Sequence, residues 1–306
     1  MSKHSEIDFN KVAAELAAAV LASPGAEAAR NFSATRRQAV YNLAERFMAL
    51  MFPGCFGSEA VAIEDTEAYI EYQLRVLAGE LFPHVRQAFE HMCYIECTEN
   101  CDCLDHSRRA VAHLANSLPA IRRTLGQDVQ AAYEGDPAAR SQGEVVLAYP
   151  FLEAITVQRI AHALYEEDVP VIPRMMTEWA HSRTGIDIHP GAQLGPRFFI
   201  DHGTGVVIGE TTTIGANVRV YQGVTLGALS FPLDEHGNPI KGVKRHPDIE
   251  DDVIIYSGAT ILGGETVVGK GSVIGGNVWL THSVAPYTKV YNAQPGPKLV
   301  NGGGTN

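Results

Sequence analysis

Aliphatic side chains recur every six residues through the C-terminal part of the chain, and this period restricts the fold more than any other feature. A period of six fits neither an amphipathic helix nor an isolated strand. It fits a β-solenoid, in which each short flat face contributes one inward side chain. We therefore predict a β-solenoid. Its inward positions form three runs that step by six: Ile188, Leu194 and Ile200; Ile208, Ile214, Val220 and Leu226; and Ile249, Ile255, Ile261, Val267, Val273 and Trp279.

Glycine is concentrated in the same part of the chain. Residues 1–184 hold 7 of the 29 glycines, and residues 185–306 hold the other 22. Glycine suits the corners of a solenoid, where the backbone adopts conformations that are costly for other residues. The first part instead shows helical spacing of apolar residues, with helix boundaries expected at Pro83 and Pro119. We predict an α-helical domain over 1–184, a solenoid over 185–285 and a C-terminal tail over 286–306.

Two breaks in the repeat mark candidate functional segments. A two-residue slip after Ile200 holds Asp201 and His202, followed by Gly203 and Gly205. A longer break separates Leu226 from Ile249 and contains prolines, glycines and mixed charge. We expect residues 228–244 to leave the solenoid as a loop, and protruding loops on a stiff scaffold are where binding residues concentrate.

The residues at these breaks suit general-base catalysis. A histidine titrates near neutral pH, so His202 can take a proton from an alcohol and return it. Asp187 precedes His202 by 15 residues, close to one coil of about 18 residues. It can therefore stack beside His202 and orient the imidazole. Arg245 offers a planar fork for a carboxylate.

Composition and charge exclude several classes of protein. The formal charge of the 306-residue chain is −11, which argues against nucleic acid as the main partner. No apolar run is long enough to span a membrane. Five cysteines, an odd number, and the lack of an export signal favour a reducing cytoplasm.

Four of these cysteines, Cys93, Cys97, Cys101 and Cys103, fall within eleven residues. Thiolates at such spacing can bind zinc or an iron–sulfur cluster. The spacing matches no common zinc signature, and reduced thiols without a metal are the simpler interpretation.

Taken together, the motifs resemble the serine O-acetyltransferases of the hexapeptide-repeat acyltransferase superfamily. The resemblance covers roughly residues 128–300, and the first 125 residues match only in being helical. A weaker match lies at Asp136-Pro137-Ala138 and around Gln158–His162. The main motifs are DIHPGAQLG (187–195), IDHGTGVVIGET (200–211), QGVTLG (222–227), KRHP (244–247) and ATILGG (259–264).

The resemblance implies a role for each matching residue. His202 is the expected general base for the serine hydroxyl, with Asp187 as its orienting partner. The residues expected to grip the amino acid are Asp136, Asp201, Arg245 and His246. Arg245 is expected at the carboxylate and Asp136 and Asp201 near the ammonium, with Pro137 lining the pocket. Coenzyme A is expected to contact Gly227, Ala228 and Ser257.

The family also implies a reaction and an assembly. Acetyl-CoA is the expected co-substrate, no metal is required, and the product O-acetylserine feeds cysteine synthesis, with cysteine as an inhibitor at the serine site. Family members are left-handed parallel β-helices that form trimers, often paired into hexamers, with sites between subunits. The chain departs from the family in its longer 228–244 loop and in Ala228, where a second glycine is usual. It also lacks the C-terminal isoleucine that docks into O-acetylserine sulfhydrylase, which argues against that complex.

Three alternatives remain open at this point. The acceptor can be another hydroxylated compound, such as homoserine or a sugar. A metal-dependent hydratase on the same solenoid would hold zinc through histidines such as His189, His202 and His246. A non-catalytic scaffold or sensor would use the cysteine cluster as its functional part.

Overall fold

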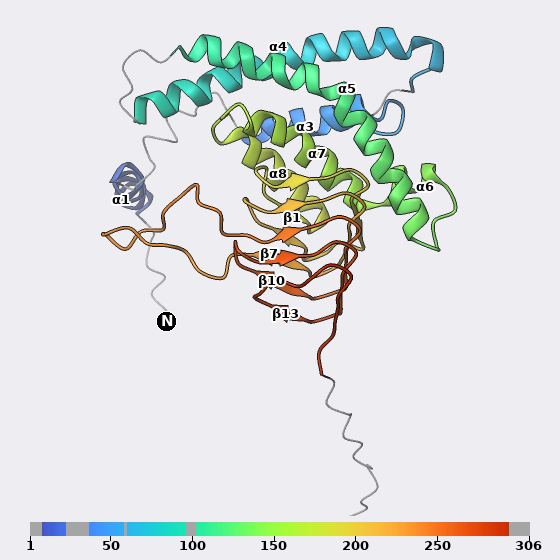
Figure 1. Ribbon diagram of the computed structural model, residues 1–306. Helices are drawn as coiled ribbons and strands as arrows, with labels where there is room; N and C mark the ends of the chain where they lie inside the picture. The colour runs from blue at the N-terminus through green and yellow to red at the C-terminus, as the bar shows by residue number, and fades with distance from the viewer. Residues whose placement is uncertain (1–7, 23–36, 58–59, 96–101, 294–306) are drawn as a thin grey trace, which may run out of the picture.

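The computed structural model of the chain describes residues 8–22, 37–57, 60–95 and 102–293. A helical part is followed by a parallel β-solenoid (Figure 1), as the sequence predicted. The last helix ends at Thr184 and the first strand begins at Asp187. None of the helices in the described ranges is long and apolar enough to cross a membrane.

Long helices dominate the part of the chain before the solenoid. The predicted boundaries at Pro83 and Pro119 are wrong, because α4 and α5 each continue through their proline. An internal proline costs a helix about 3 kcal/mol, but buried Leu81 and Val85 flank Pro83 and buried Leu118 precedes Pro119. Core packing on both helices thus outweighs the local cost. The helices are α1 (Phe9–Ala22), α3 (Arg37–Met51), η1 (Ile63–Asp65, 3₁₀), α4 (Thr66–Ile95), α5 (Cys103–Gly135), α6 (Gln142–Ala148), α7 (Pro150–Tyr165) and α8 (Ile172–Thr184).

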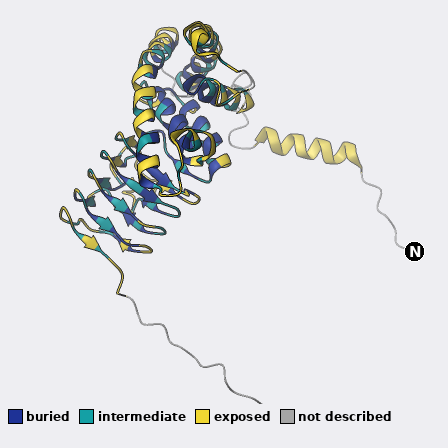
Figure 2. Ribbon diagram, turned by 90° about the vertical axis from the view of Figure 1, so that its right-hand side faces the viewer, coloured by how far each residue is buried: buried dark blue, intermediate teal, exposed yellow. Residues whose placement is uncertain are grey.

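Helix α1 buries none of its residues and is exposed on every side (Figure 2). The core of the helical part comes from the longer helices. Buried Phe47, Leu77, Leu114 and Ile155 belong to α3, α4, α5 and α7, respectively.

The solenoid is built from three parallel sheets whose strands stack coil upon coil. Sheet A contains β1 (Asp187–Ile188), β4 (Val207–Ile208), β7 (Thr225–Gly227), β10 (Thr260–Leu262) and β13 (Trp279–Leu280). Sheet B contains β2 (Gln193–Leu194), β5 (Thr213–Ile214), β8 (Asp248–Ile249) and β11 (Val267–Val268). Sheet C contains β3 (Phe199–Asp201), β6 (Arg219–Tyr221), β9 (Ile254–Ile255), β12 (Val273–Ile274) and β14 (Lys289–Val290).

The inward positions agree with the six-residue runs as far as Ile261 and then shift by one residue. Ile208, Val220 and Leu226 are buried as predicted. Beyond Ile261 the buried residues are Val268, Ile274 and Leu280, so the prediction of Val267, Val273 and Trp279 is wrong. The corner at Gly263 and Gly264 separates Ile261 from Val268 by seven residues instead of six. Successive strand residues face opposite sides, so one extra residue places Trp279 outside with 68% of its surface exposed.

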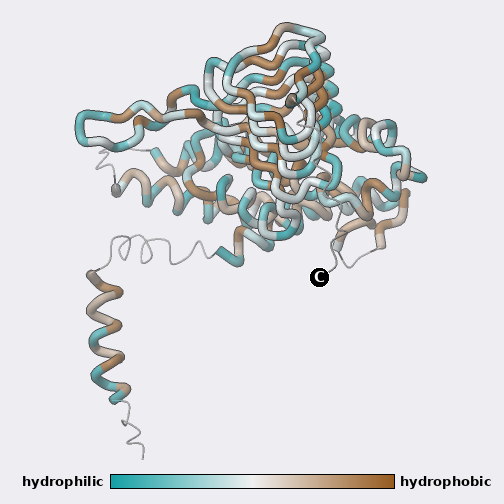
Figure 3. The backbone as a smooth tube through the Cα atoms, turned by 90° about the horizontal axis from the view of Figure 1, so that it is seen from below, coloured by the Kyte–Doolittle hydropathy of each residue, from teal (hydrophilic) through white to brown (hydrophobic). Residues whose placement is uncertain are grey.

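The long break leaves the solenoid between β7 and β8 as an exposed loop, as expected (Figures 1 and 3). Its middle is a hairpin in which Leu233 pairs with Pro239. The Asp234 carboxylate accepts hydrogen bonds from the backbone N–H groups of His236 and Asn238 at 2.9 and 2.8 Å. The coil resumes in register, because β5 pairs with β8 as it pairs with β2.

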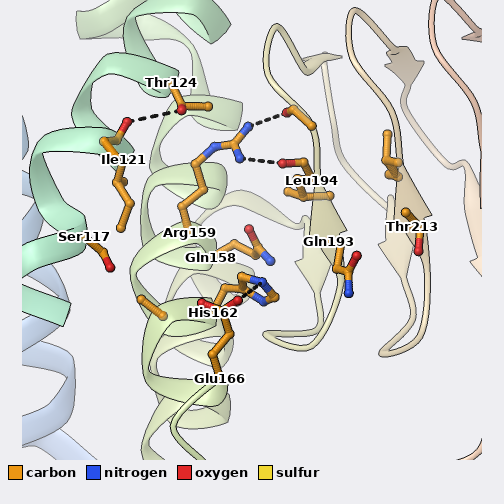
Figure 4. A pocket seen from close by; sticks show the side chains of 14 residues that line it. Ser117, Ile121, Thr124, Gln158, Arg159, His162, Glu166, Gln193, Leu194 and Thr213 are labelled. Carbon is orange, nitrogen blue, oxygen red and sulfur yellow. Dashed lines mark hydrogen bonds and ion pairs between the residues drawn. The ribbon is translucent and has the colours of Figure 1, made fainter. Parts of the chain in front are cut away.

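A buried ion pair joins the helices to the first coil. The Asp128 carboxylate of α5 is fully buried and lies 3.0 Å from the Arg159 guanidinium of α7. Arg159 also donates to the backbone oxygens of Leu194 and Gly195 at 2.8 Å (Figure 4). Asp128 accepts from the backbone N–H of Phe198 at 2.9 Å. Burial raises the pKa of Asp128 to about 6, although Arg159 and this N–H oppose the rise.

Replacing Arg159 by methionine is expected to lower the free energy of unfolding by about 3–5 kcal/mol, because it leaves a buried carboxylate without its counter-charge. The measurement is urea unfolding at pH 8. Arg75→Met is the matched control. It breaks an exposed pair with Glu71 on α4 and should cost at most about 0.5 kcal/mol. Equal losses in the two variants would contradict a structural role for the Asp128–Arg159 pair.

Candidate active site

The predicted site residues lie at the two opposite edges of sheet A. The strands of sheet A begin beside the corners that carry His202 and Ser257, here called the His202 edge. They end beside the corners that carry Gly227, Ala228, Arg245 and His246, here called the Arg245 edge. One copy of the chain therefore presents two half-sites, separated by the width of a sheet.

The slip in the repeat forms an unusual corner at the His202 edge. His202 has φ 59°, in the left-handed region that non-glycine residues rarely adopt. Gly203 follows at φ 87°, and a Cβ there would lie 2.4 Å from Cδ1 of Ile186. Glycine is thus required next to His202. The imidazole is 71% exposed, and a strained backbone that presents an exposed functional group is typical of active sites.

Two carboxylates accompany the His202 imidazole. Oδ1 of Asp201 lies 3.6 Å from its Nδ1, and Asp136, which caps the C-terminus of α5, is close enough for the two charges to interact. Oδ2 of Asp136 accepts a hydrogen bond from the Tyr149 hydroxyl at 2.5 Å, and Oδ1 accepts from the backbone N–H of Ala138 at 2.8 Å. These two bonds lower the pKa of Asp136. The bond to Asp136 raises the pKa of Tyr149 to about 12.

Arg219 and Tyr149 belong to this half-site but were missed in the sequence. A Cβ on Gly135 would lie 2.6 Å from the Arg219 guanidinium, so this glycine allows Arg219 to approach the end of α5. The guanidinium also lies 5.8 Å from the ring centre of Phe199. Arg219 occupies an outward position of a regular coil, and nothing in the six-residue pattern distinguishes it. Pro137 lies in the exposed turn after Asp136.

Asp187 stacks one coil from the His202 corner, where its backbone N–H donates to the Val206 oxygen at 2.9 Å. Its carboxylate pairs with Arg174 of α8 at 3.1 Å, whereas the ion pair of His202 is with Asp201. Arg174 also pairs with Glu178. The structure thus brings Asp187 to the corner of His202 but directs its carboxylate toward Arg174.

At the Arg245 edge, the Arg245 guanidinium is held by a carboxylate of the chain. Arg245 pairs with Glu210, and Glu210 also accepts a hydrogen bond from the Tyr165 hydroxyl of α7 at 2.8 Å. Burial raises the pKa of Glu210, but these two bonds and the nearby charges of His189 and Arg245 together lower it overall. Glu210 lies within the quoted IGET motif, so its place in the sequence was a usable signal for this contact.

His246 is neutral and held in one tautomer. Its Nδ1 accepts from the backbone N–H of Thr211 at 3.1 Å and lies 2.9 Å from the Thr211 hydroxyl, so the proton is on Nε2. Burial, and then the neighbouring Arg245, lower the pKa of His246 to about 4. The ring packs directly against Gly209, where a Cβ would be 2.1 Å from Cδ2. His246 therefore offers a hydrogen-bond donor beside the positive charge of Arg245.

The residues expected to contact coenzyme A are also divided between the Arg245 edge and the His202 edge. Gly227 ends β7 and precedes Ala228 at the Arg245 edge, while Ser257 lies in the corner between β9 and β10 at the His202 edge. A groove of about 590 Å³ lies between α5, α7 and sheet B (Figure 4). Its lining includes Arg159, His162 and Thr213 and none of the predicted site residues.

The cysteine cluster is only partly described. Cys93 is disulfide-bonded, so the interpretation of the four cysteines as reduced thiols is wrong for this residue. Its Sγ lies 3.3 Å from Sγ of Cys103. Burial raises the pKa of the Cys103 thiol. Cys97 and Cys101 lie outside the described residues. A disulfide-bonded sulfur has no thiolate to offer, so Cys93 in this state does not suit a metal site.

Comparison with known proteins gives one consistent result. No family model matches the chain. It is 49% identical over 249 residues to a protein of Synechococcus elongatus named "Serine acetyltransferase, plasmid", a match that covers 80% of this chain and 78% of the relative.

Two solved structures from Entamoeba histolytica are similar in fold. Serine acetyltransferase isoform 3, in complex with cysteine, superposes with a TM-score of 0.71 at 35% identity and covers 85% of this chain and 83% of its own. Serine acetyltransferase 1, in complex with L-cysteine, gives 0.70 at 35% identity, with 84% and 99% covered. These names favour an acyltransferase over a metal-dependent hydratase or a scaffold.

Replacing Gly209 by alanine is expected to push the His246 ring aside and to lower the free energy of unfolding by about 1–3 kcal/mol through overpacking. Urea unfolding and the imidazole NMR signal of His246 are the measurements. The control is Gly79→Ala in α4, where a Cβ meets nothing within 4 Å and should raise helix stability by up to about 1 kcal/mol. An unshifted His246 signal in Gly209→Ala would show that the ring does not depend on this glycine.

Proposed function

The chain belongs to the serine acetyltransferase family, and from this membership we propose that it transfers the acetyl group of acetyl-CoA to the hydroxyl of L-serine. The products are O-acetyl-L-serine and coenzyme A, and we place the reaction at the first step of cysteine synthesis in the cytoplasm. The observation that carries the chemical proposal is the exposed His202 imidazole 3.6 Å from the Asp201 carboxylate, with Asp136 within electrostatic range at the end of α5.

His202 is the proposed general base. Its imidazole takes the proton of the serine hydroxyl as the oxygen attacks the thioester carbonyl. When the tetrahedral intermediate collapses, the carbon–sulfur bond breaks and the proton passes from His202 to the departing thiolate. A neighbouring carboxylate stabilises the imidazolium between these two steps. Asp187 keeps this proposed role, which requires its carboxylate to turn from Arg174 to His202.

The two half-sites match the two charged groups of an amino acid. Asp136 and Asp201 can bind the ammonium group close to His202. Arg245, with the Nε2–H of His246 beside it, can bind the carboxylate. This pairing favours serine over a sugar as the acceptor, and homoserine remains the alternative that a substrate panel must separate.

A complete site requires two copies of the chain. The His202 edge of one copy must face the Arg245 edge of another, so the contact joins two different surfaces. Such head-to-tail contacts close into rings, which fits the trimer, or hexamer of two trimers, implied by the family resemblance. The outward residues of sheet A suit this packing because they are mostly small or apolar: Asp187, Val207, Thr225, Thr260 and Trp279.

We propose that acetyl-CoA lies in the same contact, with Gly227 and Ala228 from one copy and Ser257 from the other. The exposed loop 228–244 leaves the solenoid directly after Gly227. It can therefore cover the thioester end of the cofactor. No residue of the proposed reaction path requires a metal ion.

His202→Ala is expected to lower the rate of coenzyme A release with serine by roughly 10²–10⁴-fold, the usual contribution of a general base, with unfolding unchanged. The rate is followed with a thiol reagent. His84→Ala in α4, a half-buried histidine of the helical part, is the control and should keep wild-type turnover. Near-normal turnover in His202→Ala would remove His202 from its role, and wild-type protein that releases no coenzyme A with serine would refute the proposed function.

Mixing two inactive variants tests the division of the site between copies. When His202→Ala and Arg245→Gln chains are denatured together and refolded in equal amounts, about a quarter of the contacts combine two intact edges if copies mix at random in a head-to-tail ring. Activity near a quarter of wild type is therefore expected. The variants refolded separately and then mixed are the control, and an inactive co-refolded mixture would place each site within one copy.

A further inference from the structure

Tyr149 makes a contact that no sequence motif indicated. It directly precedes α7, and its hydroxyl donates to Oδ2 of Asp136 at 2.5 Å across thirteen residues of chain. The side chain is half-buried and makes no capping bond to its own helix. Its polar group is thus committed to the carboxylate of Asp136.

The Asp136 carboxylate is held at both oxygens. Tyr149 binds Oδ2, and the backbone N–H of Ala138 binds Oδ1 at 2.8 Å. An ionised carboxylate has about four acceptor positions, so each oxygen keeps about one lone pair for another donor. With two fixed donors, the free lone pairs have a defined direction. Without the Tyr149 hydroxyl, the carboxylate of Asp136 can rotate about its terminal bond.

The Tyr149 ring also connects Asp136 to the strand that carries Asp201 and directly precedes His202. It packs edge-on against Phe151, with centroids 6.5 Å apart, and Phe151 packs edge-on against Phe199 at 5.2 Å. Phe151 and Phe199 are each 1% exposed, and Phe199 lies two residues before Asp201 in β3. A buried aromatic row therefore fixes the position of Tyr149 relative to both carboxylates.

We propose that Tyr149 is a positioning residue for the amino-acid substrate: its hydroxyl orients the Asp136 carboxylate so that the free lone pairs meet the ammonium group beside His202. This inference rests on the proposed function, because it takes Asp136 as an ammonium ligand. Tyr149 itself does not touch the reacting atoms, so its loss should weaken serine binding and leave the chemical step intact.

Tyr149→Phe keeps the ring and removes only the hydroxyl. The KM for serine is expected to rise roughly tenfold, in line with a hydrogen bond to a charged group. The kcat and the KM for acetyl-CoA should stay within about twofold of wild type, because a positioning role at the ammonium affects binding alone. Tyr72→Phe on α4, where the ring is 65% exposed, is the matched control and should leave all three constants unchanged.

A double variant that combines Tyr149→Phe with Asp136→Asn tests whether Tyr149 affects serine binding through Asp136 or independently of it. If Tyr149 acts through Asp136, the double variant should bind serine no more weakly than Asp136→Asn alone. Tyr149→Leu removes the packing as well, and should lower the melting temperature without raising the serine KM beyond that of Tyr149→Phe.

Two results would overturn this role for Tyr149: a serine KM within twofold of wild type in folded Tyr149→Phe, or losses that add in the double variant. If Asp136→Asn weakens serine binding while Tyr149→Phe does not, the positioning role fails and the proposed function stands. If wild-type protein does not turn over serine at all, the proposed function itself fails.

Discussion

The rest of the structure depends on the buried pair of Asp128 and Arg159. It joins α5 and α7, and through the Leu194 and Gly195 oxygens it holds the first coil of the solenoid. About two turns beyond Asp128, the same helix ends and presents Asp136 to the His202 corner. A buried charge tolerates little displacement, because separation from its partner leaves it uncompensated in a poorly solvating interior. The pair therefore aligns an element from the helical part with a corner of the solenoid.

The solenoid presents chemistry only at its corners. Inward side chains fill the core, and outward side chains of the flat faces stack on those of the next coil, as Tyr221 does on Tyr256 at 5.1 Å. A corner, in contrast, can depart from the repeat without disturbing the next coil. The His202 slip and the long loop are two such departures, and β5 still pairs with β8 across the second. Two corners on either side of one sheet cannot meet within one chain. Assembly of the proposed site is thereby linked to association of copies.

The fold could be predicted from the sequence because each six-residue face of a coil contributes one inward side chain, so the coil repeats directly in the sequence. The predictions of inward positions and of helix boundaries failed where a single insertion or tertiary packing, and not the repeat, determined the structure. One extra residue at Gly263 and Gly264 moved Trp279 outside, and packing carried α4 and α5 through Pro83 and Pro119. The positions of His202, Asp201, Arg245 and His246 at corners of the solenoid followed from breaks and motifs. The sequence did not indicate the contacts of Tyr149 and Arg219 or the Arg174–Asp187 pair. Each of these contacts joins segments that share no local pattern.

Among the described residues, helices anchor the solenoid at one end only. Helices α7 and α8 cover its first coil, where Ile186 and Phe198 are fully packed, while β13 and β14 form the far end with Trp279 and Tyr291 exposed. Each coil is hydrogen-bonded only to its neighbours, so local unfolding starts at the outer coil and proceeds coil by coil toward the helices. Local opening should therefore become rarer toward the helices. The corner with the strained His202 backbone lies near the anchored end, where fraying of the outer coils reaches it last.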